Sequence, residues 1–268
     1  MSAYRTKAEV QREIVAHFHN TLARSACKPC QLPRKPKLLG SSIKVEKGLK
    51  RGVLTAVLYM SPANEAYLDQ NRTACPFASE SCIKACLGHS SGRLALGSSM
   101  NARIWKTALR AGCKGQFIEL LDIEIKGHAA KAAKLGKEPA IRINGSTDTG
   151  HGILAAKRHP GVQFYDYTKN IKRMRRYLAG ELPSNYYLTF SFSGENQAWC
   201  EEVLASGGNV AAIFETMPDS WLGHRVINGD ETDVRYQDES PLIVGLTFKA
   251  SSNREQAMDA AGSFVIRN

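Results

Sequence analysis

Apolar and polar residues alternate along the chain with two different periods, and the change of period marks the expected elements. In residues 8–24, Val10, Ile14 and Leu22 recur at helical spacing with charged residues between them, which predicts an amphipathic N-terminal helix. From residue 52 onward, short apolar runs recur between longer segments with helical periodicity. We expect these runs to be buried strands of a largely parallel sheet.

Six such runs predict six strands, at residues 53–60, 140–144, 162–167, 186–192, 209–214 and 242–248. Helical patterns lie between them, at residues 97–135, around 153–158, at 196–205 and after 248. This alternation is typical of repeated βα units, so we expect an α/β fold: a full or partial βα barrel with an N-terminal helical extension. A long loop, rather than a glycine-rich phosphate-binding turn, follows the first strand, which favours the barrel over an open doubly wound sheet.

A basic connector follows the N-terminal helix. Pro29, Pro33 and Pro36 discourage regular structure in it. We therefore divide the chain into residues 1–36, the helix and connector, and residues 37–268, the βα domain that carries the candidate chemistry.

Composition limits the class of protein. Hydrophobic residues make up 43% of the chain, enough for a sizeable core, but no apolar run approaches the roughly 20 residues that cross a bilayer. The N-terminus lacks a stretch of the signal-peptide type, so we expect a cytoplasmic protein without a membrane partner. Lys and Arg number 36 against 25 Asp and Glu, a net charge of +11. This excess attracts polyanions and indicates a nucleotide or nucleic acid as a partner.

Three cysteines in the long loop are the main candidate for chemistry. Cys75, Cys82 and Cys86 are spaced C-x6-C-x3-C. The chain has seven cysteines, an odd number, and no export signal, which favours metal ligands over disulfides. Thiolates at such short separations can meet at one metal centre. We therefore predict that these three residues bind a metal.

Two kinds of metal site remain open. A [4Fe–4S] cluster can be held by three cysteines, which leaves one iron free for a substrate or cofactor, and the position of the loop after the first strand favours this cluster. Structural zinc needs four ligands. His89, or the Cys27-x2-Cys30 pair upstream, could supply the missing one.

Polar side chains follow five successive predicted strands. Because the carboxyl ends of barrel strands meet at one face, we expect these residues to line a pocket there. Helix N-capping is the alternative explanation for each of them. The candidates are Asn144, Ser146, Asp148, Asp166, Lys169, Ser191, Glu195, Glu215 and Lys249.

A basic run from Lys169 to Arg176 (KNIKRMRR) is a candidate for contacts with phosphates. The alternative is the solvated face of a helix.

Several segments of the chain resemble the bacteriophage gene product 88 family. The resemblance runs from about Lys37 to the C-terminus, and its most specific parts are the cysteine loop and FYDYTK at 164–169. The other matching segments are KLLGSSIK, LYMSPA, RINGSTD, LTFS and NVA. It implies a phage-type origin, and hence the cytoplasm of a host cell. The family has no settled activity, so the resemblance does not imply a reaction.

The organisation is also distantly similar to that of radical S-adenosylmethionine enzymes, which place a three-cysteine loop after the first strand of a partial βα barrel. Their usual spacing is C-x3-C-x2-C, from which this chain departs. The resemblance implies that S-adenosylmethionine binds at the open iron. Its supporting residues would be Asn144, Ser146, Asp148, and Ser191 or Glu195, and a substrate would lie beside Asp166, Lys169 and Glu215.

The sequence thus predicts a phage-type iron–sulfur enzyme, with radical S-adenosylmethionine chemistry on a nucleotide or nucleic acid. The alternative is a nucleic-acid-binding phage protein with a structural zinc or iron–sulfur site. The sequence predicts no oligomeric state.

Overall fold

The computed structural model describes residues 5–22, 31–63, 73–86, 96–249 and 254–267. Cys27, Cys30 and His89, the candidates for a fourth metal ligand, lie outside these ranges.

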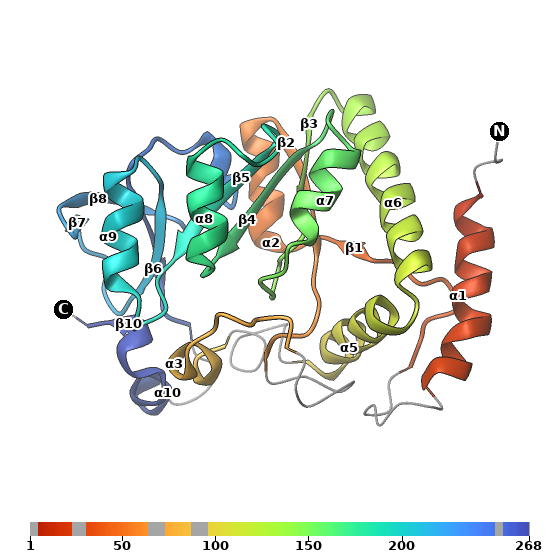
Figure 1. Cartoon of the computed structure of the whole chain (residues 1–268), viewed down its shortest axis with the longest axis horizontal. Coiled ribbons are helices and arrows are strands. Elements are labelled where there is room, and N and C mark those ends of the chain that lie inside the picture. The colour runs from red at the N-terminus through yellow and green to blue at the C-terminus, as the bar shows by residue number, and fades with distance from the viewer. Residues whose placement is uncertain (1–4, 23–30, 64–72, 87–95, 250–253, 268) are drawn as a thin grey trace.

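Six parallel strands lie side by side in chain order and form the centre of a ten-stranded sheet (Figure 1). They are β2 (Val53–Leu58), β3 (Glu138–Arg142), β4 (Gln163–Thr168), β5 (Tyr186–Ser191), β6 (Val210–Phe214) and β9 (Ile243–Thr247). Successive βα units generate this order, because each crossover returns the chain to the neighbouring position. All six predicted strands are confirmed, with ends displaced by about two residues at most.

Four further strands complete the sheet and were not predicted. They are β1 (Leu39–Gly40) beside β2, β8 (His224–Asn228) beside β9, β7 (Ser220–Trp221) beside β8, and β10 (Val265–Ile266) beside β6. Among the described strands, β1 and β7 end the sheet and do not pair with each other. The fold is therefore α/β with a mostly parallel sheet, in the strand order of a barrel but not closed into one by these strands.

Helices α6, α7, α8 and α9 lie over one face of the sheet (Figure 1). The helix expected across residues 97–135 is two helices, because the backbone leaves helical geometry at Cys113, with φ −133° and ψ 56°. The α-helices are α1 (Lys7–Leu22), α2 (Ile43–Glu46), α3 (Glu80–Lys84), α5 (Gly97–Gly112), α6 (Lys114–Lys134), α7 (His151–Arg158), α8 (Ile171–Leu178), α9 (Gln197–Ala205) and α10 (Arg254–Ala261). Short 3-10 helices are η1 (Lys47–Arg51), η4 (Arg235–Gln237) and η5 (Gly262–Phe264).

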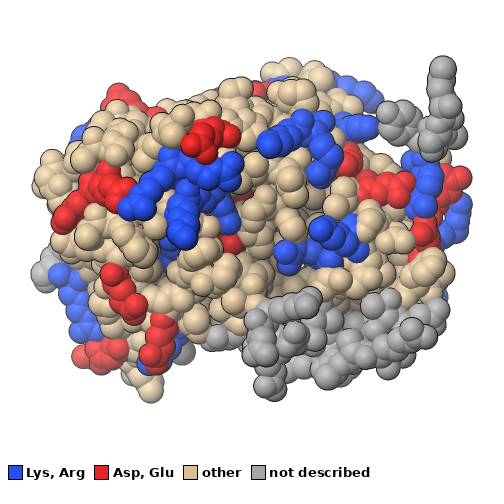
Figure 2. All heavy atoms as spheres, viewed as in Figure 1, with Lys and Arg blue, Asp and Glu red and all other residues tan. Residues whose placement is uncertain are grey.

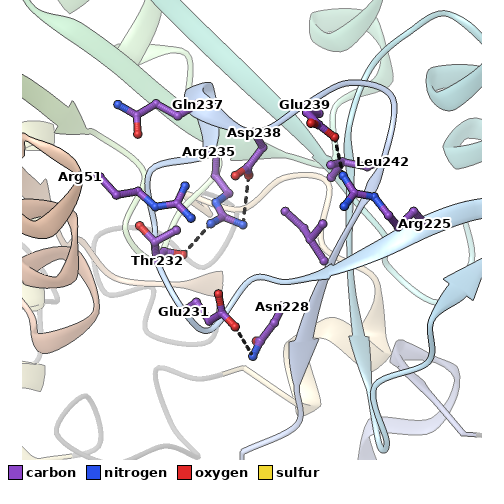
Figure 3. Close-up of a pocket in the computed structure, with 11 residues that line it drawn as sticks. Arg51, Arg225, Asn228, Glu231, Thr232, Arg235, Gln237, Asp238, Glu239 and Leu242 are labelled. Carbon is purple, nitrogen blue, oxygen red and sulfur yellow. Dashed lines mark hydrogen bonds and ion pairs between the residues drawn. The ribbon is translucent and has the colours of Figure 1, made fainter.

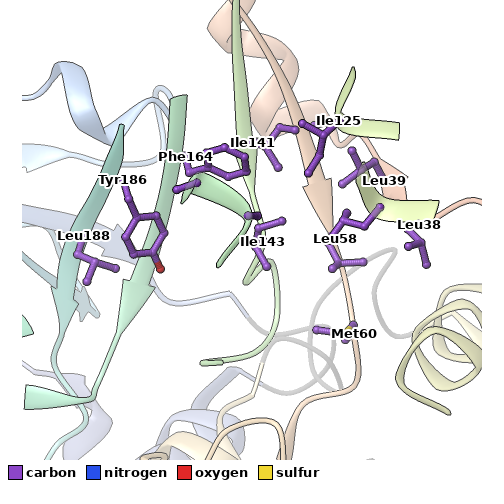
Figure 4. Packing of buried hydrophobic residues seen from close by; sticks show 14 of the residues in the cluster. Leu38, Leu39, Leu58, Met60, Ile125, Ile141, Ile143, Phe164, Tyr186 and Leu188 are labelled. Atoms are coloured by element: carbon purple, nitrogen blue, oxygen red, sulfur yellow. The ribbon is translucent and has the colours of Figure 1, made fainter. Parts of the chain in front are cut away.

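The main hydrophobic core fills the space between these helices and the sheet (Figure 4). Alternate residues of the strands point into it, among them Leu58, Ile141 and Leu188. Helix α1 contributes Val10 and Ile14 to the same core. The N-terminal helix therefore packs on the βα domain, and the loss of its apolar surface from water stabilises both.

The opposite face of the sheet carries the intervening residues and is more polar. Arg142, Tyr165, Tyr167 and Thr189 lie on it, at alternate positions of β3, β4 and β5. Residues 229–242, between β8 and β9, cross this face, and Val234 in that segment packs on Val53, Ala140 and Tyr165. We call this side the polar face.

Close packing of α7 on the sheet makes a test of the fold. A Cβ atom on Gly152 would lie 2.4 Å from Oδ2 of Asp166 and 2.6 Å from the ring of Tyr186. We expect Gly152→Ala to lower the free energy of unfolding by about 1–3 kcal/mol through overpacking, measured by urea denaturation.

The matched control is Gly127→Ala in α6, where a Cβ atom would meet nothing within 4 Å. It should raise the free energy of unfolding by about 0.5–1 kcal/mol, because alanine favours the helix. Equal effects of the two substitutions would contradict the packing of α7.

Candidate functional site

The cysteine loop docks on the carboxyl ends of β3 and β5. Ser79, the N-cap of α3, accepts a hydrogen bond from the backbone N–H of Cys82 at 3.1 Å and donates one to the carbonyl of Ser193 at 2.5 Å. The Cys75 thiol donates to the carbonyl of Ser146 at 3.6 Å. These contacts join the loop after β2 to the loops after β3 and β5, at one end of the sheet.

The three loop thiols influence one another electrostatically. Cys75, Cys82 and Cys86 are half-buried, and none of them is in a disulfide bond. The pKa of Cys75 is raised to about 12, first by burial and then by the neighbouring Cys86, with smaller effects from Asp148 and Cys82, while Lys169 opposes them. The thiols therefore share one neighbourhood, and the Cys75 thiol is protonated at neutral pH in this state.

Within the described ranges, no three His, Cys, Asp or Glu side chains converge closely enough to form a metal site. The prediction that Cys75, Cys82 and Cys86 hold a metal therefore stays a prediction. The chemistry of the donor set fits a soft metal, because all three side chains are thiols.

Asp148 ties the loop after β3 to the end of β4. Its carboxylate accepts hydrogen bonds from Oγ1 of Thr168 at 2.9 Å, the backbone N–H of Lys169 at 2.8 Å and Nη1 of Arg173 at 2.5 Å. The backbone N–H of Asp148 donates to the carbonyl of Ala74, next to the first cysteine, at 2.8 Å. Asp148 thus holds the cysteine loop and β4 together.

Asn144 and Asp166 form a second buried junction, on the core side of the sheet. The backbone N–H and Nδ2 of Asn144 donate to the two carboxylate oxygens of Asp166 at 2.7 and 2.9 Å, and the Tyr186 hydroxyl donates at 2.9 Å. Asp166 is only 1% exposed. Burial raises its pKa to about 6, although the three donors oppose the rise. Both oxygens are thus engaged within the protein.

Lys169 and Ser191 lie beside the cysteine loop. Nζ of Lys169 donates to Oγ of Ser191 at 3.3 Å and lies 5.5 Å from the ring centroid of Phe264. The ammonium group also lowers the pKa of Cys75. Lys169 therefore places a positive charge at the thiols, where an anionic group could bind.

The structure gathers some of the predicted site residues and separates others. Cys75, Ser146, Asp148, Lys169 and Ser191 are joined by the contacts described above. Glu195 is exposed. Glu215 is hydrogen-bonded through its backbone. Its N–H donates to the carbonyl of Ile266, and Nη2 of Arg254 donates to its carbonyl. Lys249 pairs with Asp230 at 2.7 Å.

A buried charge cluster on the polar face was missed by sequence reasoning. Nη1 of Arg142 donates to the Asp233 carboxylate at 3.1 Å, and the Tyr165 hydroxyl donates to it at 3.2 Å. Asp233 lies 91 positions along the chain from Arg142, in the segment between β8 and β9. The signal in the sequence for this cluster was Arg142 itself, in the apolar run of β3, because a charge in a buried strand needs a partner.

The basic run along α8 is largely neutralised. Arg173 pairs with Asp148, Arg175 with Glu202 at 2.7 Å, and Arg176 with Glu181 at 3.0 Å. Figure 2 shows basic and acidic side chains next to each other over this part of the surface. A nucleic-acid partner therefore stays a prediction from net charge. Among the described helices, none is both long and apolar enough to cross a membrane.

Comparison with protein families matches residues 35–262 to the model described as Gene product 88. No curated protein matches the chain, and no solved structure matches it.

The raised pKa of Asp166 predicts a pH dependence of stability. The folded state binds this proton more tightly than the unfolded chain, whose pKa is near 3.8. The contribution to stability is therefore complete below about pH 4 and is lost as the pH rises through about 6. Asp166→Asn should be destabilised by about 1–3 kcal/mol, because its amide N–H₂ faces donors, and should lack this dependence.

Urea unfolding of both proteins in steps between about pH 4 and pH 7 measures the effect. The difference in stability between them should shrink as the pH rises. A difference that stays constant across this range would contradict the burial of an ionisable carboxyl at residue 166.

Proposed function

The chain belongs to the gene product 88 family, and we propose that it is an iron–sulfur enzyme whose cluster is held by Cys75, Cys82 and Cys86. The observation that carries the proposal is the docking of the cysteine loop on the strand ends, through Cys75 on Ser146 and Ser79 on Ser193. The carboxyl ends of parallel strands are where α/β proteins gather their reactive groups.

The donor set favours a cluster over zinc. The loop contributes three thiols, and a cubane cluster held by three cysteines keeps one iron for a ligand. A closed zinc site needs a fourth protein ligand, and the candidates for it lie outside the described residues. Metal binding would release the thiol protons, because the metal favours the thiolates.

Convergence of the thiols on one cluster would require a rearrangement of α3. This helix has five residues and no buried member, and Cys82 packs against a small cluster that includes Phe248 and Phe264. Ser79 and Ser146 hold the start of the loop while the Cys82–Cys86 segment adjusts. This accounts for thiols that are neighbours but do not yet converge.

S-adenosylmethionine is the cofactor we propose for the open iron, and the bound cluster would supply the electron that cleaves it. The Lys169 ammonium and the Ser191 hydroxyl, 3.3 Å apart beside the thiols, would hold its charged and polar groups. Asn144, Asp148 and Asp166 would act indirectly, by holding the strand ends in place. A nucleotide or nucleic-acid substrate agrees with the net charge of +11.

Metal analysis of protein purified without oxygen tests the cluster. We expect about four iron and four sulfide per chain and a brown protein absorbing at about 400 nm. Cys75→Ala, Cys82→Ala and Cys86→Ala should each lose the iron. The matched control, Cys113→Ala, removes a buried cysteine between α5 and α6 and should keep it. A colourless protein that holds one zinc ion per chain would contradict the proposal.

Cleavage of S-adenosylmethionine under reductant tests the cofactor separately. Lys169→Met should lower the cleavage rate about tenfold and keep the iron, since it removes one charge-assisted contact. Lys172→Met, at an exposed position of α8, is the control and should change neither. If the protein holds the cluster but never cleaves S-adenosylmethionine, the proposed cofactor is contradicted and the proposed metal site is not.

A further inference from the structure

A cavity of about 500 Å³ lies between the connector after α1 and helix α5. The connector lines it with residues between 31 and 37, and α5 lines it with residues between 101 and 106. The volume falls within the roughly 300–1,000 Å³ of pockets that hold small molecules. None of the three loop cysteines is among the described residues of its wall.

Hydrogen bonds hold the connector in place as one wall of the cavity. The backbone N–H of Gln31 donates to Oδ1 of Asn101 at 2.8 Å, and Nδ2 of Asn101 donates to the carbonyl of Gln31 at 2.9 Å. Further along the connector, Nε2 of Gln11 in α1 donates to the carbonyl of Pro36 at 2.7 Å. The connector is therefore fixed to both α5 and α1, and the cavity is formed before a ligand binds.

Lys106 of α5 lies in the wall of this cavity and is only 8% exposed. None of the described residues forms a hydrogen bond or an ion pair with its ammonium group, which lies 5.6 Å from the ring centroid of Trp105. Burial lowers the pKa of Lys106 to about 8, although Glu124 opposes the shift, and Lys37 adds to it. A buried charge is costly unless a group of opposite charge accompanies it. The position of Lys106 therefore favours an anion as its partner.

The carboxylate that acts on Lys106 is already engaged. Oε2 of Glu124 accepts hydrogen bonds from the backbone N–H groups of Leu38 and Leu39 at 3.0 and 2.8 Å. Its other oxygen, Oε1, pairs with Nζ of Lys7 at 2.8 Å. Lys7 thus compensates the charge of Glu124, and the charge of Lys106 is left in excess.

The cavity as a whole carries unmatched positive charge. Its described wall has no acidic side chain and three basic ones, Lys35, Lys37 and Lys106. A smaller cavity of about 250 Å³, beside β8 and η4, has as many acidic as basic side chains in its wall (Figure 3). There Arg225 pairs with Glu239, and Arg235 pairs with Asp238 at 3.3 Å. Of these two cavities, the larger is therefore the one suited to an anion.

Leu32, Pro33 and Ala102 add apolar surface to the wall of the larger cavity. We propose that this cavity binds a small organic anion, whose phosphate or carboxylate group pairs with Lys37 and Lys106 and whose apolar part packs on this surface. Hydrogen bonds between ammonium and oxyanion groups are strong because both partners are charged. The site goes beyond the iron–sulfur proposal and does not rest on it, because it uses none of the cysteines.

Thermal unfolding with phenyl phosphate, benzoate, inorganic phosphate or chloride at equal ionic strength tests the site. An organic anion that binds the folded state should raise the melting temperature above its value in chloride. A shift with phenyl phosphate alone assigns a phosphoryl group, a shift with benzoate alone assigns a carboxylate, and a shift with both means that either group is accepted. No shift with either overturns the proposal.

Inorganic phosphate tests the apolar part of the proposal. It should bind about tenfold more weakly than phenyl phosphate, because it buries no apolar surface. Equal binding of the two would contradict the packing of the ligand on the apolar wall.

Lys106→Met removes the buried ammonium group and keeps a side chain of similar length. It should weaken binding of the organic anion about tenfold. Without ligand it should melt at the wild-type temperature or above it, since it removes a buried charge that lacks a counterion. Lys37→Met, at an exposed position, cannot disturb the core and should weaken binding about fivefold.

Lys134→Met is the matched control, because Lys134 is exposed on α6 and is not among the residues that line either cavity. It should bind the anion like the wild type. Lys106→Met and Lys37→Met proteins that also bind like the wild type would overturn the proposal. Cys75→Ala should keep the response to the anion, which separates this outcome from the fate of the iron–sulfur proposal.

Discussion

Parallel pairing of β2, β3, β4, β5, β6 and β9 in chain order carries every loop that follows a strand to the same end of the sheet. The cysteine loop follows β2, and it can reach the loops after β3 and β5 only because of this order. Two hydrogen bonds, from Cys75 to Ser146 and from Ser79 to Ser193, use that proximity. The position of the thiols beside Lys169 is thus a consequence of strand order.

Polar residues at the strand ends divide into those that hold the structure and those that remain free to bind. Asn144, Asp148 and Asp166 form hydrogen bonds with neighbouring strands and loops. Lys169 and Ser191 make one weak contact with each other, at 3.3 Å. The hydrogen bonds of the first three residues fix the strand ends and so hold Lys169 and Ser191 in place beside the thiols. A preorganised site is supported in this way.

The sequence predicted the six central strands because each is an apolar run too short for a helix. It missed β1, β7 and β10 because two residues carry no pattern, and it missed β8 because three of its five residues are His224, Arg225 and Asn228. The cysteine loop was visible from spacing alone. Asp166 was expected at a substrate, but the sequence cannot distinguish a carboxylate that binds a ligand from one that braces two strands. The pairing of Arg142 with Asp233 was hidden, because it joins segments that only the folded sheet brings together.

The central claim is that the three loop cysteines converge on one iron–sulfur cluster. Electron paramagnetic resonance of the reduced protein, purified without oxygen, tests it most directly. The account predicts the signal of a reduced [4Fe–4S] cluster in the wild-type protein and in Cys113→Ala, and its absence from Cys75→Ala. A wild-type protein that gives no such signal and carries zinc instead would contradict it.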